Sequence, residues 1–168
     1  MIRWIAPLAA TAALALAPQA GATTHVKGGE IVVGRGAAGV TLGMTRTQVR
    51  SLLGRPFYSN ANGFMQYAPD SAKNIFDVYL GPKSRVRQIV IAGGRFKIGD
   101  VTVFARGSLR KLRKTYGKRL RAVRGETGDP MYRIRSRYLG WTVWTDFLVT
   151  KHSLDATPLD VFILFPYH

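Results

Sequence analysis

The chain has 168 residues, enough for one domain with a substantial core, and a formal net charge of +16 at neutral pH. It contains 25 Lys and Arg against nine Asp and Glu, and it has no cysteine. This composition excludes a disulfide-stabilised scaffold and a lipid anchor attached through cysteine, and it favours anionic partners.

Residues 1–22 are typical of a cleavable signal peptide. Arg3 supplies a positive start, Trp4 to Ala17 is mostly apolar, and Ala20-Gly21-Ala22 has the small-x-small pattern that precedes a cleavage site. An uncleaved transmembrane helix is the alternative, but the apolar run is shorter than the roughly 20 residues that a bilayer core requires. We therefore expect a protein that is secreted or periplasmic after cleavage near Ala22, and that is not lipid-anchored.

Residues 23–39 are rich in glycine and are expected to form a flexible lead with one edge strand at Ile31 to Val33. Within this lead, Gly34 to Gly39 has the G-x-G-x-x-G spacing of dinucleotide-binding loops. A true fingerprint opens a helix and is followed about 20 residues later by an acidic residue. No Asp or Glu occurs between Glu30 and Asp70, so the sequence predicts no nucleotide site.

Residues 40–94 carry the signals of one helix followed by antiparallel strands. Thr45 and Gln48 have the spacing of a capping box, and Val49 to Leu53 continues with helical periodicity until Gly54 ends the helix. Two alternating runs, at 75–80 and 85–91, then flank a turn and predict a hairpin.

Residues 95–168 repeat this order. Ser108 is the expected N-cap of a second helix that ends at Gly117, and strands are predicted at Met131 to Leu139, Trp141 to Val149 and Leu159 to Phe165. The predicted fold is therefore α+β: two tandem helix-plus-antiparallel-strand units form one curved sheet with the helices packed on a face. Two unrelated α+β halves are the alternative.

The run from Gly39 to Pro56, GVTLGMTRTQVRSLLGRP, resembles the signature of the SmpA/OmlA outer-membrane lipoprotein domain and of the related β-lactamase-inhibitor-protein fold. The resemblance lies in the Gly-Met-Thr helix start and the Val-x-x-Leu-Leu-Gly-x-Pro finish. It implies an extracytoplasmic interaction module that presents a sheet face to another protein. Because the chain lacks the lipobox cysteine and any disulfide, neither outer-membrane assembly nor β-lactamase inhibition carries over.

The positive charge is concentrated between Arg95 and Arg137, where 14 Lys and Arg stand against three acids. Arg133, Arg135 and Arg137 alternate with apolar residues, so a strand would place the three guanidiniums on one face. The second helix adds further cations, Arg110, Lys111, Arg113 and Lys114, and the loop after it adds Lys118, Arg119, Arg121 and Arg124. If they converge, these residues form an anion-binding surface; solvated faces that point apart are the alternative.

Within the predicted strand from Trp141 to Val149, Trp141 and Phe147 lie on the same face, which predicts burial. Trp144 lies on the opposite face and is a candidate partner-binding residue. No metal or cofactor site is expected, because the three histidines do not have ligand spacing. Asp155 and Asp160 are weak candidates for acid–base catalysis, since surrounding cations should lower their pKa.

The composition and these patterns favour an exported, non-enzymatic binding module that recognises an acidic protein or an anionic envelope polymer through a cationic face. Peripheral contact with a membrane surface fits the same charge, and no specific nucleic acid is expected. The alternatives are a small exported enzyme acting on cell-envelope material and a structural envelope protein.

Overall fold

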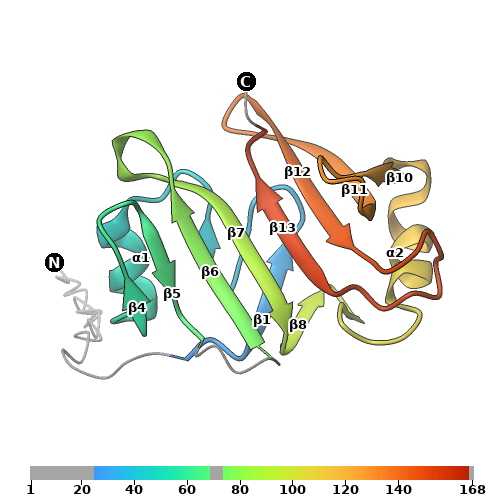
Figure 1. The fold of residues 1–168 in the computed structure, drawn as a ribbon, viewed down its shortest axis with the longest axis horizontal. Coiled ribbons are helices and arrows are strands. Elements are labelled where there is room, and N and C mark those ends of the chain that lie inside the picture. Colours follow the sequence, from blue (N-terminus) through green and yellow to red (C-terminus); the bar gives the residue numbers. More distant parts are fainter. Residues whose placement is uncertain (1–24, 69–73, 167–168) are drawn as a thin grey trace, which may run out of the picture.

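The structure, a computed structural model, describes residues 25–68 and 74–166 (Figure 1). The predicted signal peptide, residues 1–22, lies outside these ranges, and its assignment stays a prediction. Across both ranges, no helix combines the length and the apolar character needed to cross a bilayer.

The larger of two sheets has eight strands within the described ranges, and all of its neighbours are antiparallel. It consists of two four-stranded meanders that meet where the last strand of the chain pairs with β7, and it runs along the long axis of the molecule in Figure 1. In pairing order the strands are β10 (Leu120–Arg124), β11 (Pro130–Tyr138), β12 (Trp141–Leu148), β13 (Asp160–Leu164), β7 (Val86–Gly93), β6 (Asn74–Leu80), β5 (Phe64–Gln66) and β4 (Tyr58–Ser59).

The smaller sheet has five short strands in the same part of the chain. Its central pair, β1 and β8, is parallel and joins segments that are far apart in the sequence, with Gly28 opposite Arg95. In pairing order the strands are β3 (Val40–Thr41), β2 (Gly36–Ala37), β1 (Gly28–Val32), β8 (Arg95–Ile98) and β9 (Val101–Thr102).

Two α-helices occur in the described ranges, near opposite ends of the long axis (Figure 1). The first, α1 (Arg46–Leu53), begins with the predicted capping box: the Thr45 hydroxyl accepts from the Gln48 amide, and the Gln48 side chain accepts from the Thr45 amide. The second, α2 (Ser108–Tyr116), begins after Gly107, which has a left-handed conformation; the predicted N-cap Ser108 is instead the first helical residue and is buried. Two 3-10 turns are η1 (Pro82–Ser84) and η2 (Gly117–Arg119).

The core lies on one face of the eight-stranded sheet. Strand register places Phe76, Ile91, Val161, Phe147 and Tyr132 side by side across five strands, and all five are buried. Side chains alternate between the two faces of a strand, so the opposite face is turned to solvent. Below it is called the solvent face.

The smaller sheet and both helices cover the core face. Phe96 of β8 stacks on Phe76 with ring centroids 5.8 Å apart, which joins the two sheets. The helices contribute buried Val49, Leu109 and Leu112. The glycine-rich turn after β1 contacts β12, because the Gly34 amide donates to the hydroxyl of buried Thr145 at 2.8 Å.

The predicted α+β fold of two helix-plus-strand units in one curved sheet is wrong. Of the described residues 47% are in strands and 17% in helices, and the strands form two sheets rather than one. The second sheet arises because the expected flexible lead, residues 23–39, contains β1 and β2, which bury Ile31 and Ala37. The edge strand predicted at Ile31 to Val33 overlaps β1, but the parallel partner of β1, β8, lies beyond the end of the first predicted unit, residues 40–94.

Candidate anion-binding surface

The arginine stripe of β11 lies on the solvent face. Arg133 is half-buried and Arg135 and Arg137 are exposed, whereas Tyr132 and Ile134, on the other face of the strand, are buried in the core. This is the arrangement that the alternation of the sequence predicts.

Neighbouring strands add to this stripe. Register places Arg121 of β10 opposite Arg133, and Trp144 of β12 opposite Arg135. A concavity of about 460 Å³ results, which we call the cationic hollow; it is lined by Arg119, Arg121, Val123, Arg133, Arg135 and Trp144. Arg137 lies outside this lining.

Arg133 is held in place from two sides. Its Nε and Nη2 atoms each donate to one carboxylate oxygen of Asp146 at 2.7 Å, and its guanidinium carbon lies 3.6 Å from the centroid of the Trp144 ring. Burial raises the pKa of Asp146, and the hydrogen bonds and charge of Arg133 oppose this shift. The charge of Arg133 is therefore balanced by Asp146, and its role is to fix the wall of the hollow.

The hydrogen-bond acceptors of two other arginines of the hollow are backbone carbonyls rather than carboxylates. Arg119 donates to the Arg135 carbonyl and Arg121 donates to the Lys118 carbonyl, and these neutral acceptors do not cancel a positive charge. Ion pairs join Arg110 to Asp155 and Arg133 to Asp146 instead. Arg119, Arg121 and Arg135 therefore present three guanidiniums at one concavity, a geometry suited to carboxylate or phosphate groups.

The helix cations do not join them. The apolar residues of α2 pack on the core side of the sheet, and none of Arg110, Lys111, Arg113 and Lys114 lines the hollow. Arg110 is paired with Asp155 at 2.5 Å on the exposed surface. Of the two alternatives left open by the sequence, the helix and the strand do not converge, because the two elements lie in different layers.

Sequence reasoning placed Arg119 and Arg121 in a loop, but Arg121 belongs to strand β10 and Arg119 ends the turn before it. The alternation of Leu120, Ala122 and arginines was a strand signal, and the charge density obscured it. The pairing of β10 with β11 is what brings these two arginines beside Arg135.

The two tryptophans of β12 differ from expectation in one respect. Trp144 lies on the solvent face and is half-buried, and the Arg133 guanidinium lies over its ring. Trp141, predicted to be buried, is 60% exposed. It shares its parity with buried Val143 and Phe147, but it is the first residue of the strand and lies beyond the edge of the core.

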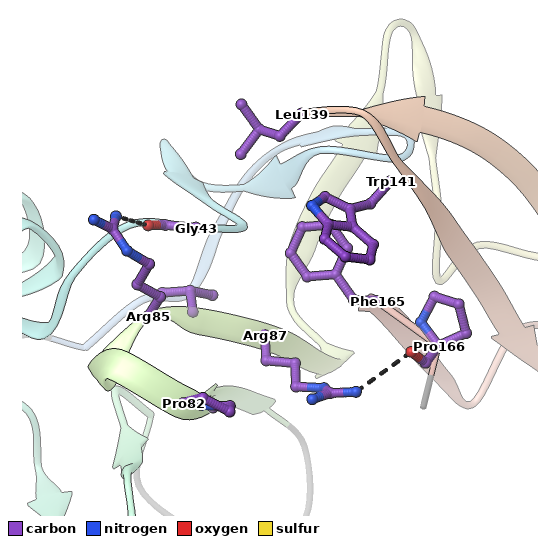
Figure 2. A pocket seen from close by; sticks show the side chains of 10 residues that line it. Gly43, Pro82, Arg85, Arg87, Leu139, Trp141, Phe165 and Pro166 are labelled. Atoms are coloured by element: carbon purple, nitrogen blue, oxygen red, sulfur yellow. Dashed lines mark hydrogen bonds between the residues drawn. The ribbon is translucent and has the colours of Figure 1, made fainter. Parts of the chain in front are cut away.

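A second concavity was not foreseen from the sequence. It has a volume of about 420 Å³ and is lined largely by apolar residues, among them Leu139, Trp141 and Phe165, together with Arg85 and Arg87 (Figure 2). Its residues come from turns and strand ends that are distant in the sequence, which explains why no local pattern pointed to it. We call it the apolar pocket.

The candidate acids and metal ligands are dispersed. Asp155 is occupied by Arg110, and Asp160 lies in β13, where burial raises its pKa, contrary to the lowering expected from the cationic surroundings. Within the described ranges, no group of three or more His, Asp or Glu side chains is close enough to hold a metal ion. These residues give no indication of a catalytic centre.

Comparison with known proteins shows a likeness of fold. The search against sequence families found no matching family, and the search of curated proteins found no match. Among solved structures, YjgB, a DUF4309 family protein from Bacillus subtilis, is similar: the alignment covers 79% of this chain and 88% of that one, with 16% sequence identity and a TM-score of 0.51. At this identity the likeness extends to the fold alone, and it does not point to catalysis.

Proposed function

We propose that this protein is an exported, non-catalytic module that binds an acidic protein or an anionic envelope polymer through the cationic hollow. The proposal rests mainly on one observation: Arg119, Arg121 and Arg135 line the same concavity. Arg119 and Arg121 each donate a hydrogen bond to a backbone carbonyl, which is a neutral acceptor. Export rests on the signal-peptide pattern of residues 1–22.

The surroundings of the hollow favour anions over any other class of ligand. The segment from Arg95 to Arg137 carries most of the excess positive charge, which attracts anions over distances up to about a Debye length, roughly 8–10 Å in physiological salt. The Arg133–Asp146 pair fixes one wall, so less side-chain entropy is lost there on binding.

A binding assay with two probes tests the proposal. Poly-L-glutamate supplies carboxylates and polyphosphate supplies phosphates, and the affinity for each is measured at low and high salt. We expect the double variant Arg121→Ser, Arg135→Ser to bind at least one probe more weakly by at least about tenfold, since each charge-assisted hydrogen bond contributes about 1.5–3 kcal/mol. Arg133 is left intact because its loss would disturb the sheet.

The matched control is Arg95→Ser, Lys97→Ser, which removes the same charge from exposed positions of β8 in the smaller sheet. If the probe binds in the cationic hollow, this control should lose much less affinity than the double variant. Equal losses in the two variants would show that only the overall charge matters and would contradict the proposed site.

A further inference from the structure

The apolar pocket presents large apolar side chains to solvent at the junction of the two meanders. Leu139 and Trp141, at the turn between β11 and β12, are 61% and 60% exposed, and Phe165 follows β13 on the adjoining side of the pocket (Figure 2). A concavity of about 420 Å³ with apolar walls and few polar groups falls in the range of small-molecule sites, which span roughly 300–1,000 Å³.

The backbone of the turn between β11 and β12 has a conformation that is unfavourable for leucine. Leu139 and Gly140 join paired residues Tyr138 and Trp141, and both have positive φ angles, 52° and 80°. A two-residue turn of this kind favours Asn-Gly or Asp-Gly, because a leucine in the left-handed region is strained. The chain thus holds an exposed leucine in a strained conformation at the rim of a pocket, a combination typical of functional sites.

Leu139 also packs against Gly43, a residue that lines the same pocket. A Cβ atom added at Gly43, which has a φ of 86°, would lie 3.0 Å from Leu139 Cδ1. The leucine side chain therefore packs closely over the Gly43 backbone, and Gly43, Leu139 and Trp141 all line the pocket.

Arg85 and Arg87 are charged residues in the lining of the pocket. For Arg85 the position of the guanidinium is defined by one backbone acceptor. Arg85 is exposed, and its Nη1 atom donates to the Gly43 carbonyl at 2.8 Å, a neutral acceptor that orients the guanidinium without cancelling its charge (Figure 2). None of the described residues that line the pocket is acidic. An anionic group is therefore favoured beside Arg85, and a cationic group is disfavoured.

We propose that the apolar pocket binds a small amphiphilic carboxylate, whose apolar chain lies against Leu139, Trp141 and Phe165 and whose carboxylate accepts hydrogen bonds from Arg85. This site is separate from the cationic hollow, since the two share no lining residue. The binding of such a ligand does not depend on whether the hollow binds a polymer.

Titration of the full chain with three probes of equal chain length tests the charge requirement. Octanoate, octan-1-ol and octylammonium are compared by calorimetry, with tryptophan fluorescence as a second signal. We expect octanoate to bind more tightly than octan-1-ol, and octylammonium to bind most weakly. Arg85→Gln should weaken octanoate about tenfold, as the loss of a charge-assisted bond implies, and should leave octan-1-ol unchanged. Arg95→Gln, at an exposed position of β8, is the control for a change of one charge.

A second variant tests the strained leucine. Leu139→Asn provides the preferred turn residue, so we expect the thermal unfolding midpoint of the variant to rise by a few degrees. We expect its octanoate affinity to fall at least about fivefold, because the substitution gains stability and loses an apolar contact with the ligand. Leu159→Asn replaces another exposed leucine outside the pocket and should change neither property. The proposal is overturned if octan-1-ol or octylammonium binds as well as octanoate, if no probe binds, or if Leu139→Asn retains full octanoate affinity.

Discussion

Arg133 and Trp144 lie on adjacent strands with the guanidinium carbon of one 3.6 Å from the ring centroid of the other. The same guanidinium binds both carboxylate oxygens of buried Asp146. Arg133 therefore stabilises the sheet through its ion pair with Asp146, whereas Arg135 and Arg137 are exposed on the same face. The three arginines of β11 do not have equivalent roles.

Arg133→Ser is therefore expected to destabilise the protein. It would leave the Asp146 carboxylate buried and unpaired, and removal of one partner of a buried ion pair typically costs about 3–5 kcal/mol. Arg137→Ser, at an exposed position of the same strand, should change the free energy of unfolding by no more than about 0.5 kcal/mol. Urea unfolding of both variants compares the two; similar effects would show that the Arg133–Asp146 pair is not structural.

Ile31→Ala tests the smaller sheet. Ile31 is 1% exposed in β1, and truncation of a buried isoleucine to alanine costs about 2–5 kcal/mol. The neighbouring Val32 is 44% exposed, and Val32→Ala is the matched control, with an expected loss below about 0.5 kcal/mol. If residues 23–39 were a flexible lead instead, both variants would unfold at the same urea concentration as the parent chain.

Asp160→Asn tests the effect of burial on one carboxyl group of β13. Burial raises the pKa of Asp160 in the folded protein, so the folded state binds the proton more tightly than the unfolded state does. The contribution of Asp160 to the free energy of unfolding is therefore fully present at pH values below the ordinary Asp pKa. It is lost as the pH rises through the raised pKa of Asp160 in the folded protein. Asp160→Asn should therefore be more stable than the parent at pH 7 and equally stable near pH 3. The pH dependence of the urea midpoint measures this difference, and a difference that grows on acidification would contradict it.

Local signals in the sequence predicted local structure well. The capping box of Thr45 and Gln48 identified the start of α1, because its hydrogen bonds lie within four residues. The alternation of apolar residues at 75–80 and 85–91 identified the β6–β7 hairpin, and that of β11 identified the solvent-facing arginines.

The features that were missed depend on contacts between distant segments. The apolar run at Ile31 to Val33 predicted a strand, but it did not identify β8 as the partner that places β1 inside a second sheet. The cationic hollow depends in the same way on the pairing of β10 with β11. The exposure of Trp141 depends on where the core ends along β12. The alternation of side chains between the two faces of a strand does not specify that position.

The parallel pairing of Gly28 with Arg95 also bears on the kinetics of folding. The whole of α1 and the strands from β4 to β7 lie between these two residues in the sequence, so β1 gains its second neighbour only after a large loop has closed. Contacts of such high sequence separation slow folding. While the chain is being synthesised, one edge of β1 therefore stays open to other strands until β8 has emerged, and β1 can mispair during that interval.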